Sequence, residues 1–286
     1  MIKNIVFILL LLSLTSCGVN KNYSFFVAGH TYGNPLDKRD RKGLYKLFKD
    51  KIPYINGQEN MKFGVLLGDV VWQPKFWPEA EKDILDFKMP IYIARGNHDG
   101  SLNLIEEKFG KSYKSFVKNE SLFIILDPNI DKWNISGEQL AFLKNEIKEN
   151  KKTTSKIFVF THQVIWWHNK IYPKPFPNSI ENKSPNVNYW SEIEPLLKET
   201  NKSVYIFAGD VGAFSKEHRK KDHIIEYDYH KDENITYVSS GMGGGIRDNF
   251  IIVDVLKTGE VNLRLIHLNG NDINGLGKLK DYVRKK

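Results

Sequence analysis

Three short apolar segments of this chain each end in a compact loop of polar side chains. Apolar runs of this kind, separated by helix-forming stretches, are typical of buried parallel strands that are connected by helices. Because the carboxyl ends of such strands meet at one edge of a sheet, we expect their loops to lie together and to form the ligand site. The three segments are Leu66-Leu67-Gly68-Asp69, Ile93-Ala94-Arg95-Gly96-Asn97-His98-Asp99 and Phe158-Val159-Phe160-Thr161-His162.

The 286-residue chain alternates between strand and helix patterns and then turns to strands, which predicts an α/β fold in one large domain. The clearest helix begins at Ser136, where Ser136 and Gln139 form a capping-box pattern and Leu140, Leu143 and Ile147 share one face. Further helices are expected at 42–49 and 101–109, and strands at 23–27, 63–67, 90–94, 121–126, 156–160, 204–208, 224–229, 235–239, 250–256 and 261–268.

The polar loops carry side chains that suit a divalent metal ion. Asp69 offers a carboxylate, Asn97 a carboxamide and His162 an imidazole. This mixed oxygen and nitrogen set is typical of Mn, Fe or Zn sites. Each loop alone is a weak signal, because a His after a strand is more often a hydrogen-bonded structural residue. The repetition of the strand-then-loop pattern favours a metal centre.

In this order the loops resemble those of the calcineurin-like metallophosphoesterase superfamily. The resemblance implies a four-layer α/β/β/α sandwich of two mixed β-sheets flanked by helices, over residues 23–268. It also implies a two-metal centre built by five loops of the patterns Asp-x-His, Gly-Asp, Gly-Asn-His, a lone His and Gly-His-x-His. The corresponding segments here are Ala28-Gly29-His30, Gly68-Asp69, Gly96-Asn97-His98, His162 and Gly209-Asp210-Val211-Gly212.

The implied ligand set is incomplete, and the losses fall on one of the two ions. The resemblance places one ion on Asp69, Asn97, His162 and Asp210, which all carry donor atoms. The other ion would keep only His30 and the shared Asp69, because its remaining ligand positions have no donor side chain. We therefore expect one divalent ion rather than two, with Mn or Fe favoured and Mg or Zn as alternatives.

The resemblance also suggests roles near a bound phosphate. His98 is expected to protonate the leaving oxygen or to stabilise charge, and Asp99 to orient the His98 imidazole. His30 and Arg247 are candidate cationic donors to phosphoryl oxygens. For Arg95 there are two expectations: it contacts the phosphate, or it is simply a charged residue on the surface.

Residues 166–190 form a long segment rich in aromatic residues, Pro and Asn. Connections of this length are usually functional or mobile. Trp166, Trp167 and His168 follow the His162 loop closely, so they would line a substrate pocket. An equally good interpretation is that these side chains cover the hydrophobic core.

The first residues resemble the leader of a bacterial lipoprotein. Residues 1–16 have the basic start and apolar run of a signal peptide, and Leu14-Thr15-Ser16-Cys17 resembles a lipobox. A lipid on Cys17 would tether the domain to a membrane through residues 17–22 and place it in the bacterial cell envelope, at the outer membrane or the periplasmic face. A cleaved secretory signal with an incidental Cys, or an uncleaved anchor helix, are the alternatives.

The net charge and the distribution of basic residues exclude only some classes of binding partner. A formal net charge of +8 would suit anionic lipid, phosphorylated glycan or nucleic acid, and residues 269–286 are expected to form a basic C-terminal tail. Basic residues do not alternate with aromatic ones as in nucleic-acid platforms, so nucleic acid is disfavoured. No feature indicates an oligomeric state.

Two functions fit these patterns. The first is a phosphoesterase of the envelope that cleaves a phosphate mono- or diester in a small molecule, glycan or lipid by metal-activated water. The second is a catalytically degenerate pseudoenzyme that binds a glycan, lipid headgroup or protein partner.

Overall fold

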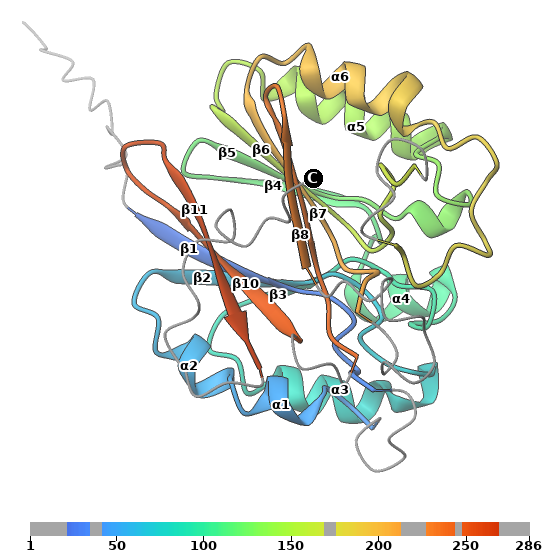
Figure 1. The fold of residues 1–286 in the computed structure, drawn as a ribbon, viewed down its shortest axis with the longest axis vertical. Helices are drawn as coiled ribbons and strands as arrows, with labels where there is room; N and C mark the ends of the chain where they lie inside the picture. The colour runs from blue at the N-terminus through green and yellow to red at the C-terminus, as the bar shows by residue number, and fades with distance from the viewer. Residues whose placement is uncertain (1–21, 35–41, 169–175, 213–226, 244–247, 269–286) are drawn as a thin grey trace, which may run out of the picture.

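Two β-sheets packed face to face form the centre of the molecule, and helices cover the outer side of each sheet (Figure 1). The structure, a computed structural model, describes residues 22–34, 42–168, 176–212, 227–243 and 248–268. The predicted α/β fold with four layers, α/β/β/α, and two mixed sheets is therefore confirmed.

The first sheet, sheet A, has the strand order β11-β10-β1-β2-β3. Strands β1, β2 and β3 are parallel, whereas β10 is antiparallel to both β1 and β11. The bounds are β1 Tyr23–Ala28, β2 Met61–Leu66, β3 Ile91–Ile93, β10 Asn249–Val255 and β11 Val261–His267.

The second sheet, sheet B, has the order β4-β5-β6-β7-β9-β8. Its four central strands β5, β6, β7 and β9 are parallel, and the edge strands β4 and β8 are antiparallel to their neighbours. The bounds are β4 Lys114–Lys118, β5 Ser121–Ile125, β6 Lys156–Thr161, β7 Ser203–Ala208, β8 Tyr227–Asp232 and β9 Ile235–Ser240.

The helices bury their apolar faces against the outer sides of the two sheets. Apolar side chains of α1 to α4 pack on sheet A, and those of α5 and α6 pack on sheet B. Their bounds are α1 Lys46–Lys49, α2 Ile52–Asn56, α3 Trp77–Ile84, α4 Leu102–Phe109, α5 Gly137–Glu149 and α6 Glu194–Lys198. Short 3-10 turns span Pro74–Phe76 and Pro128–Ile130, and a π-helical turn spans Tyr189–Ile193.

The space between the sheets is filled mainly by aromatic rings. Phe25 of β1 stacks on Phe63 of β2 at 4.9 Å between ring centroids. It also makes edge contacts with Phe123 of β5 at 5.6 Å and with Phe158 of β6 at 5.2 Å. These rings, fully buried or nearly so, pack the two sheets against each other.

The N-termini of the two longer predicted helices are held in different ways. The helix expected at 101–109 is α4, and the Ser101 hydroxyl caps it by accepting the backbone N–H of Leu104. The capping box predicted at the start of α5 does not form. Ser136 donates instead to Asp131 at 2.5 Å, and Gln139 exchanges two hydrogen bonds with the backbone of Asp127.

Other differences lie in short elements. The helix expected at 42–49 is a single turn, and the sequence did not predict β4, α2, α3 or α6. In the part of the chain described here, no helix has the length and apolar character needed to cross a bilayer. The expected signal peptide at 1–16 and tail at 269–286 lie outside the described residues.

Candidate metal centre

Five of the predicted site residues follow the carboxyl ends of strands in both sheets. His30 follows β1, Asp69 follows β2, Asn97 follows β3, His162 follows β6 and Asp210 follows β7. All are buried except Asn97, which is exposed. The aromatic packing between the sheets brings these loops to one edge of the sandwich. The group is therefore accessible to solvent on the Asn97 side.

His162 lies at the centre of this cluster. Its Nδ1 is 2.8 Å from the backbone carbonyl of Leu67, which can only accept, so Nδ1 carries the proton in the neutral ring. Nε2 then presents its lone pair. It lies 3.1 Å from Asn97 Oδ1, 3.3 Å from Asp69 Oδ1 and 3.8 Å from Asp210 Oδ1. Four acceptor atoms thus face one another without a donor among them.

Asp210 is held in place through only one of its two carboxylate oxygens. Oδ2 accepts hydrogen bonds from the hydroxyl of Ser179 at 2.7 Å and from its backbone N–H at 3.2 Å. Oδ1 is buried and has no hydrogen-bond partner. A buried carboxylate oxygen without a donor is costly unless a cation is nearby.

These observations fit a divalent ion. Donor atoms that share an ion at about 2.0–2.2 Å are separated from each other by about 3.0–3.4 Å, which is close to the separations around His162 Nε2. As they stand, the side chains contact one another directly. Among the described residues, no three His, Cys, Asp or Glu side chains form a preformed metal site. The two carboxylates, one amide oxygen and one imidazole nitrogen are nevertheless a suitable donor set.

Gly68 lets the Asp69 loop approach His162. Its φ of +79° is in the left-handed region, and a Cβ atom there would lie 2.5 Å from His162 Nδ1. Asp69 itself has a φ of 51°. Strained backbone of this kind is often found at functional sites.

Replacing Gly68 by Ala is therefore expected to lower the free energy of unfolding by about 2 kcal/mol or more, through backbone strain and displacement of the His162 ring. Urea unfolding measures this loss. Gly137→Ala is the matched control, because Gly137 also has a positive φ, +54°, but no atom within 4 Å of its Cβ position. Equal losses in the two variants would show that contact with His162 is unimportant.

The His30 side of Asp69 is occupied by Tyr32, a residue that the sequence did not single out. The Tyr32 hydroxyl lies 2.8 Å from His30 Nε2, which is also 3.4 Å from Asp69 Oδ2. The two carboxylate oxygens of Asp69 therefore face opposite sides of the cluster. The only signal in the sequence was an aromatic residue two positions after His30.

His98 is oriented by Trp72 rather than by Asp99. Its Nδ1 lies 3.1 Å from the backbone carbonyl of Trp72, and its ring stacks on the Trp72 ring at 4.4 Å between centroids. The Asp99 carboxylate instead accepts the backbone N–H groups of Gly96, Val70 and Val71. The predicted role of Asp99 toward His98 is wrong, because three backbone donors take up its oxygens.

Arg95 forms a buried ion pair instead of facing the cluster with its charged group. Its Nε donates to Asp127 Oδ2 at 2.7 Å, and another guanidinium N–H donates to the carbonyl of Gly100 at 3.2 Å. The Arg95 guanidinium therefore has a structural role in place of the predicted contact with phosphate. Arg247, the other predicted cation, lies outside the described residues.

The aromatic segment contributes mainly to the core. Trp166 is buried and packs against Tyr237 at 5.4 Å between ring centroids, so the pocket-wall interpretation is wrong for it. Trp167 packs against the same core cluster and contacts Phe176 edge-on at 5.4 Å. His168 is half-buried.

Burial makes the carboxylates of this cluster weaker acids. It raises the pKa of Asp69, Asp99 and Asp210 from 3.8 to about 6 each, and for Asp99 the negative charge of Asp69 adds to the effect. Between about pH 4 and pH 6 the folded protein therefore binds more protons than the unfolded chain. Its stability falls as the pH rises through this range.

In chelator, we expect the free energy of unfolding to decrease between pH 4 and pH 7, with Asp210 contributing about 3 kcal/mol. Asp210→Asn should show a shallower decrease, because the amide does not ionise. Urea unfolding at several pH values measures both slopes. Parallel slopes in the two proteins would contradict the burial of an ionised Asp210.

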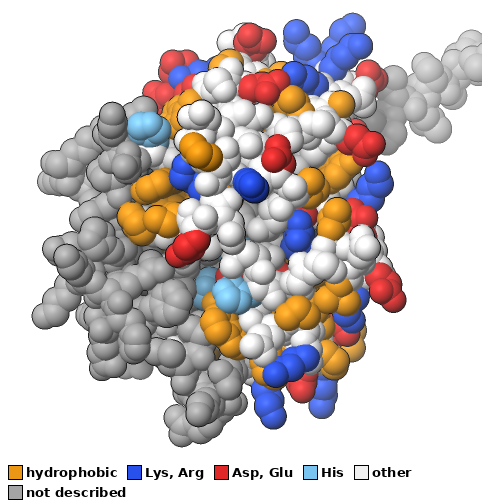
Figure 2. All heavy atoms as spheres, turned by 90° about the vertical axis from the view of Figure 1, so that its right-hand side faces the viewer, with side chains coloured by type: hydrophobic (Ala, Val, Ile, Leu, Met, Phe, Trp, Pro, Cys, Tyr) orange, Lys and Arg blue, Asp and Glu red, His pale blue; other side chains and the backbone are white. Residues whose placement is uncertain are grey.

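Among the described residues on the face shown in Figure 2, acidic and basic side chains are interspersed, and histidines are visible near the middle.

Comparison with known proteins indicates a family for this arrangement. Residues 30–213 match the family model of the calcineurin-like phosphoesterases. The fold is similar to that of a dimetal phosphatase from Danio rerio, with a TM-score of 0.59 and 12% sequence identity, covering 86% of this chain and 96% of that chain. It is also similar to a purple acid phosphatase from seeds of yellow lupin (Lupinus luteus), with a TM-score of 0.59 and 13% identity, covering 90% of this chain and 53% of that chain. No curated protein matches the sequence.

Proposed function

Since this chain belongs to the calcineurin-like phosphoesterase family, we propose that it is a metal-dependent phosphoesterase that cleaves a phosphate mono- or diester. One observation supports this most strongly. The four acceptor atoms of Asp69, Asn97, His162 and Asp210 face one another with no hydrogen-bond donor between them, an arrangement that a cation would satisfy. The family implies the use of a divalent metal, and this cluster fits one.

We propose a single resident ion on those four residues, with Mn or Fe favoured over Mg or Zn. The other half of the family's centre retains two candidate ligands, His30 and Asp69 Oδ2. The Tyr32 hydroxyl already contacts His30 Nε2. Ala28 and Gly212 supply no side-chain donor. A bound ion would act as a Lewis acid toward a phosphoryl oxygen and would lower the pKa of water.

His98 is the best placed proton donor. Its Nδ1–H is fixed by the Trp72 carbonyl, and its half-buried ring lies beside the exposed Asn97. Nε2 is then the atom that exchanges a proton with solvent or substrate. In the protonated ring it would donate to the leaving oxygen of the ester. The backbone N–H of His98 donates to Asp69 Oδ1 at 3.0 Å, which fixes this ring relative to the cluster.

The test combines metal content with turnover. Full-length protein in detergent, freed of metal with chelator and then titrated with Mn²⁺, should bind about one ion per chain and hydrolyse generic phosphate mono- or diesters. His98→Gln should retain the ion and lose most of the turnover. Absence of bound metal after Mn²⁺ is added would contradict the proposal.

A non-catalytic binding protein is the second candidate, and the contact between Tyr32 and His30 favours it because it fills half of the family's metal centre. Bound metal without turnover of any mono- or diester would support this candidate. The ligand would then be a glycan, a lipid headgroup or a protein.

For location, we propose a lipid-anchored protein of the bacterial envelope, tethered through Cys17. Mass spectrometry of the mature N-terminus tests this: a diacylglyceryl group on Cys17 is expected, and an unmodified N-terminus beyond Cys17 would contradict it.

A further inference from the structure

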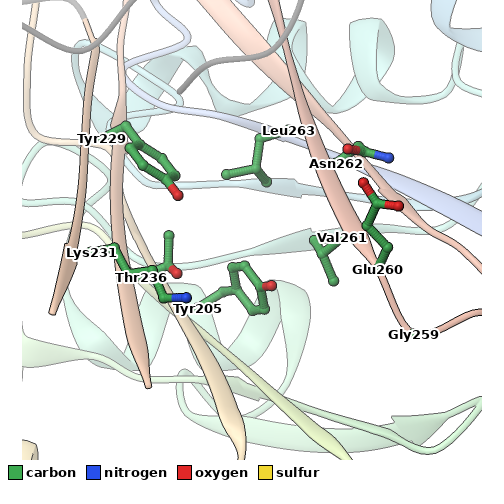
Figure 3. A pocket seen from close by; sticks show the side chains of 9 residues that line it. All are labelled: Tyr205, Tyr229, Lys231, Thr236, Gly259, Glu260, Val261, Asn262 and Leu263. Atoms are coloured by element: carbon green, nitrogen blue, oxygen red, sulfur yellow. The ribbon is translucent and has the colours of Figure 1, made fainter. Parts of the chain in front are cut away.

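A separate pocket opens between the two sheets, where β11 of sheet A faces β7, β8 and β9 of sheet B (Figure 3). Its volume is about 290 Å³, near the lower end of ligand-binding pockets. It is lined by Tyr205, Tyr229, Lys231, Thr236, Gly259, Glu260, Val261, Asn262 and Leu263.

This pocket lies at the end of the strands opposite to the metal centre. Tyr205 is near the start of β7, whereas Asp210 follows its carboxyl end. At about 3.3 Å per residue, the two positions are roughly 15 Å apart. The pocket therefore does not belong to the site described above.

Polar side chains occupy positions here that face the opposite sheet. Tyr205, Thr236 and Lys231 are adjacent across β7, β9 and β8. Inner faces of packed sheets are normally apolar, so hydroxyl and ammonium groups on this face give the open end of the sandwich an unusually polar lining. Within the described part of the chain, the hydroxyls of Tyr205 and Tyr229 have no hydrogen-bond partner. Burial raises the pKa of Tyr205 to about 12 and also raises that of Tyr229, so both remain donors.

The rim of the pocket carries one charge of each sign. Figure 3 shows Lys231 and Glu260 on opposite sides, with Tyr205 and Val261 between them. Both charged residues are exposed, and neither forms an ion pair with another described residue. A simple anion would be repelled by Glu260 and a simple cation by Lys231. A ligand that carries both charges would satisfy both residues.

We propose that this pocket binds a small zwitterion in which a short linker joins an ammonium group to a phosphate, as in a phosphoethanolamine unit. Lys231 and the tyrosine hydroxyls donate to the phosphate, and Glu260 accepts from the ammonium group. Val261 and Leu263 contact the methylene linker. None of these residues belongs to the metal centre.

Such a unit has two sources, a soluble metabolite or the headgroup of a lipid. The start of the described chain lies beside the pocket, because Asn22 accepts the backbone N–H of Lys257 at 2.8 Å, two residues before Gly259. Residues 17–22 span at most about 18 Å. The headgroup source rests on the proposed lipid anchor at Cys17, which would bring this end of the molecule close to a bilayer surface.

Ligand-observed NMR or calorimetry on full-length, detergent-solubilised protein in chelator tests the proposal without any need for phosphoesterase activity. Phosphoethanolamine should bind at least about ten-fold more tightly than inorganic phosphate or ethanolamine alone. Lys231→Met and Glu260→Gln should each weaken binding by about ten-fold or more. Lys82→Met and Glu138→Gln, two exposed residues on helices away from the pocket, are the matched controls and should have no effect.

The two sources are separated by adding glycerophosphoethanolamine, the headgroup diester. Binding as tight as that of phosphoethanolamine supports the lipid source, and binding of the monoester alone supports the soluble source. Three results would overturn the proposal: no binding at roughly 10 mM phosphoethanolamine, equal binding of phosphate alone, or binding that is unaffected by both pocket variants.

Discussion

Asp69→Asn is expected to reduce metal-dependent hydrolysis by roughly a thousand-fold or more, the size of effect that follows when metal-based charge stabilisation is lost. Asp69 is the one ligand whose two oxygens face both sides of the cluster, toward His162 at 3.3 Å and toward His30 at 3.4 Å. The amide keeps the shape of the side chain but removes the negative charge that attracts the ion. Titration with Mn²⁺ and steady-state kinetics measure the two losses separately.

The stability of this variant distinguishes loss of metal from loss of fold. Removing a buried charge should leave the metal-free protein at least as stable as the wild type at pH 7, because burial raises the pKa of Asp69. Asp86→Asn, at an exposed position, is the matched control for the substitution itself. Turnover of Asp69→Asn within ten-fold of wild type at saturating Mn²⁺ would contradict the proposed centre.

Asp127→Ala is expected to lower the free energy of unfolding by about 3–5 kcal/mol, the usual effect of breaking a buried ion pair on one side. Asp127 is fully buried, and its removal leaves the Arg95 guanidinium, 7% exposed, without its carboxylate. The same carboxylate also accepts the backbone N–H of Asn129 at 3.1 Å. For a domain of this size the melting temperature should fall by roughly 10 °C.

Two further variants test whether the loss of stability in Asp127→Ala comes from the broken ion pair. The double variant Arg95→Met with Asp127→Leu removes both charges and should recover part of the stability. Asp50→Ala breaks the exposed pair with Lys46 and should cost no more than about 1 kcal/mol. A loss below 1 kcal/mol for Asp127→Ala would show that Arg95 finds another partner or reaches solvent.

The strand and helix pattern was sufficient for the α/β class, because apolar runs and strand ends are local signals. The four layers, and the placement of the loop after β7 beside those after β2, β3 and β6, came from the resemblance to the family. The short helix α2 and the edge strand β4 were missed. Their few residues depend on packing against the sheets, which no local pattern records.

The candidate ligands were found from residue type and loop order, whereas the residues that hold them were not. The hydroxyl of Tyr32 contacts His30, the backbone carbonyl of Trp72 contacts His98, and the hydroxyl of Ser179 contacts Asp210. None of these groups has a recognisable spacing in the chain. Ser179 meets Asp210 from 31 residues away, a contact that exists only after folding.

Two of the wrong assignments share one cause. Gln139 and Asp99 were each assigned a nearby partner that their chemistry allows. In the folded chain they satisfy backbone groups instead, of Asp127 for Gln139 and of Gly96, Val70 and Val71 for Asp99. Buried backbone donors must be paired, so they compete successfully for polar side chains that a motif assigns to the active site.

The close approach of the segments that carry Gly212 and Gly241 limits how this protein could be engineered. A Cβ atom at Gly212, where φ is +86°, would lie 3.1 Å from the carbonyl carbon of Gly241, and one at Gly241 would meet the carbonyl group of Val211. A histidine introduced at 212 would therefore strain the backbone before it offered a ligand. Converting this protein into a bimetallic enzyme would require redesign of two chain segments together, and a single substitution would not suffice.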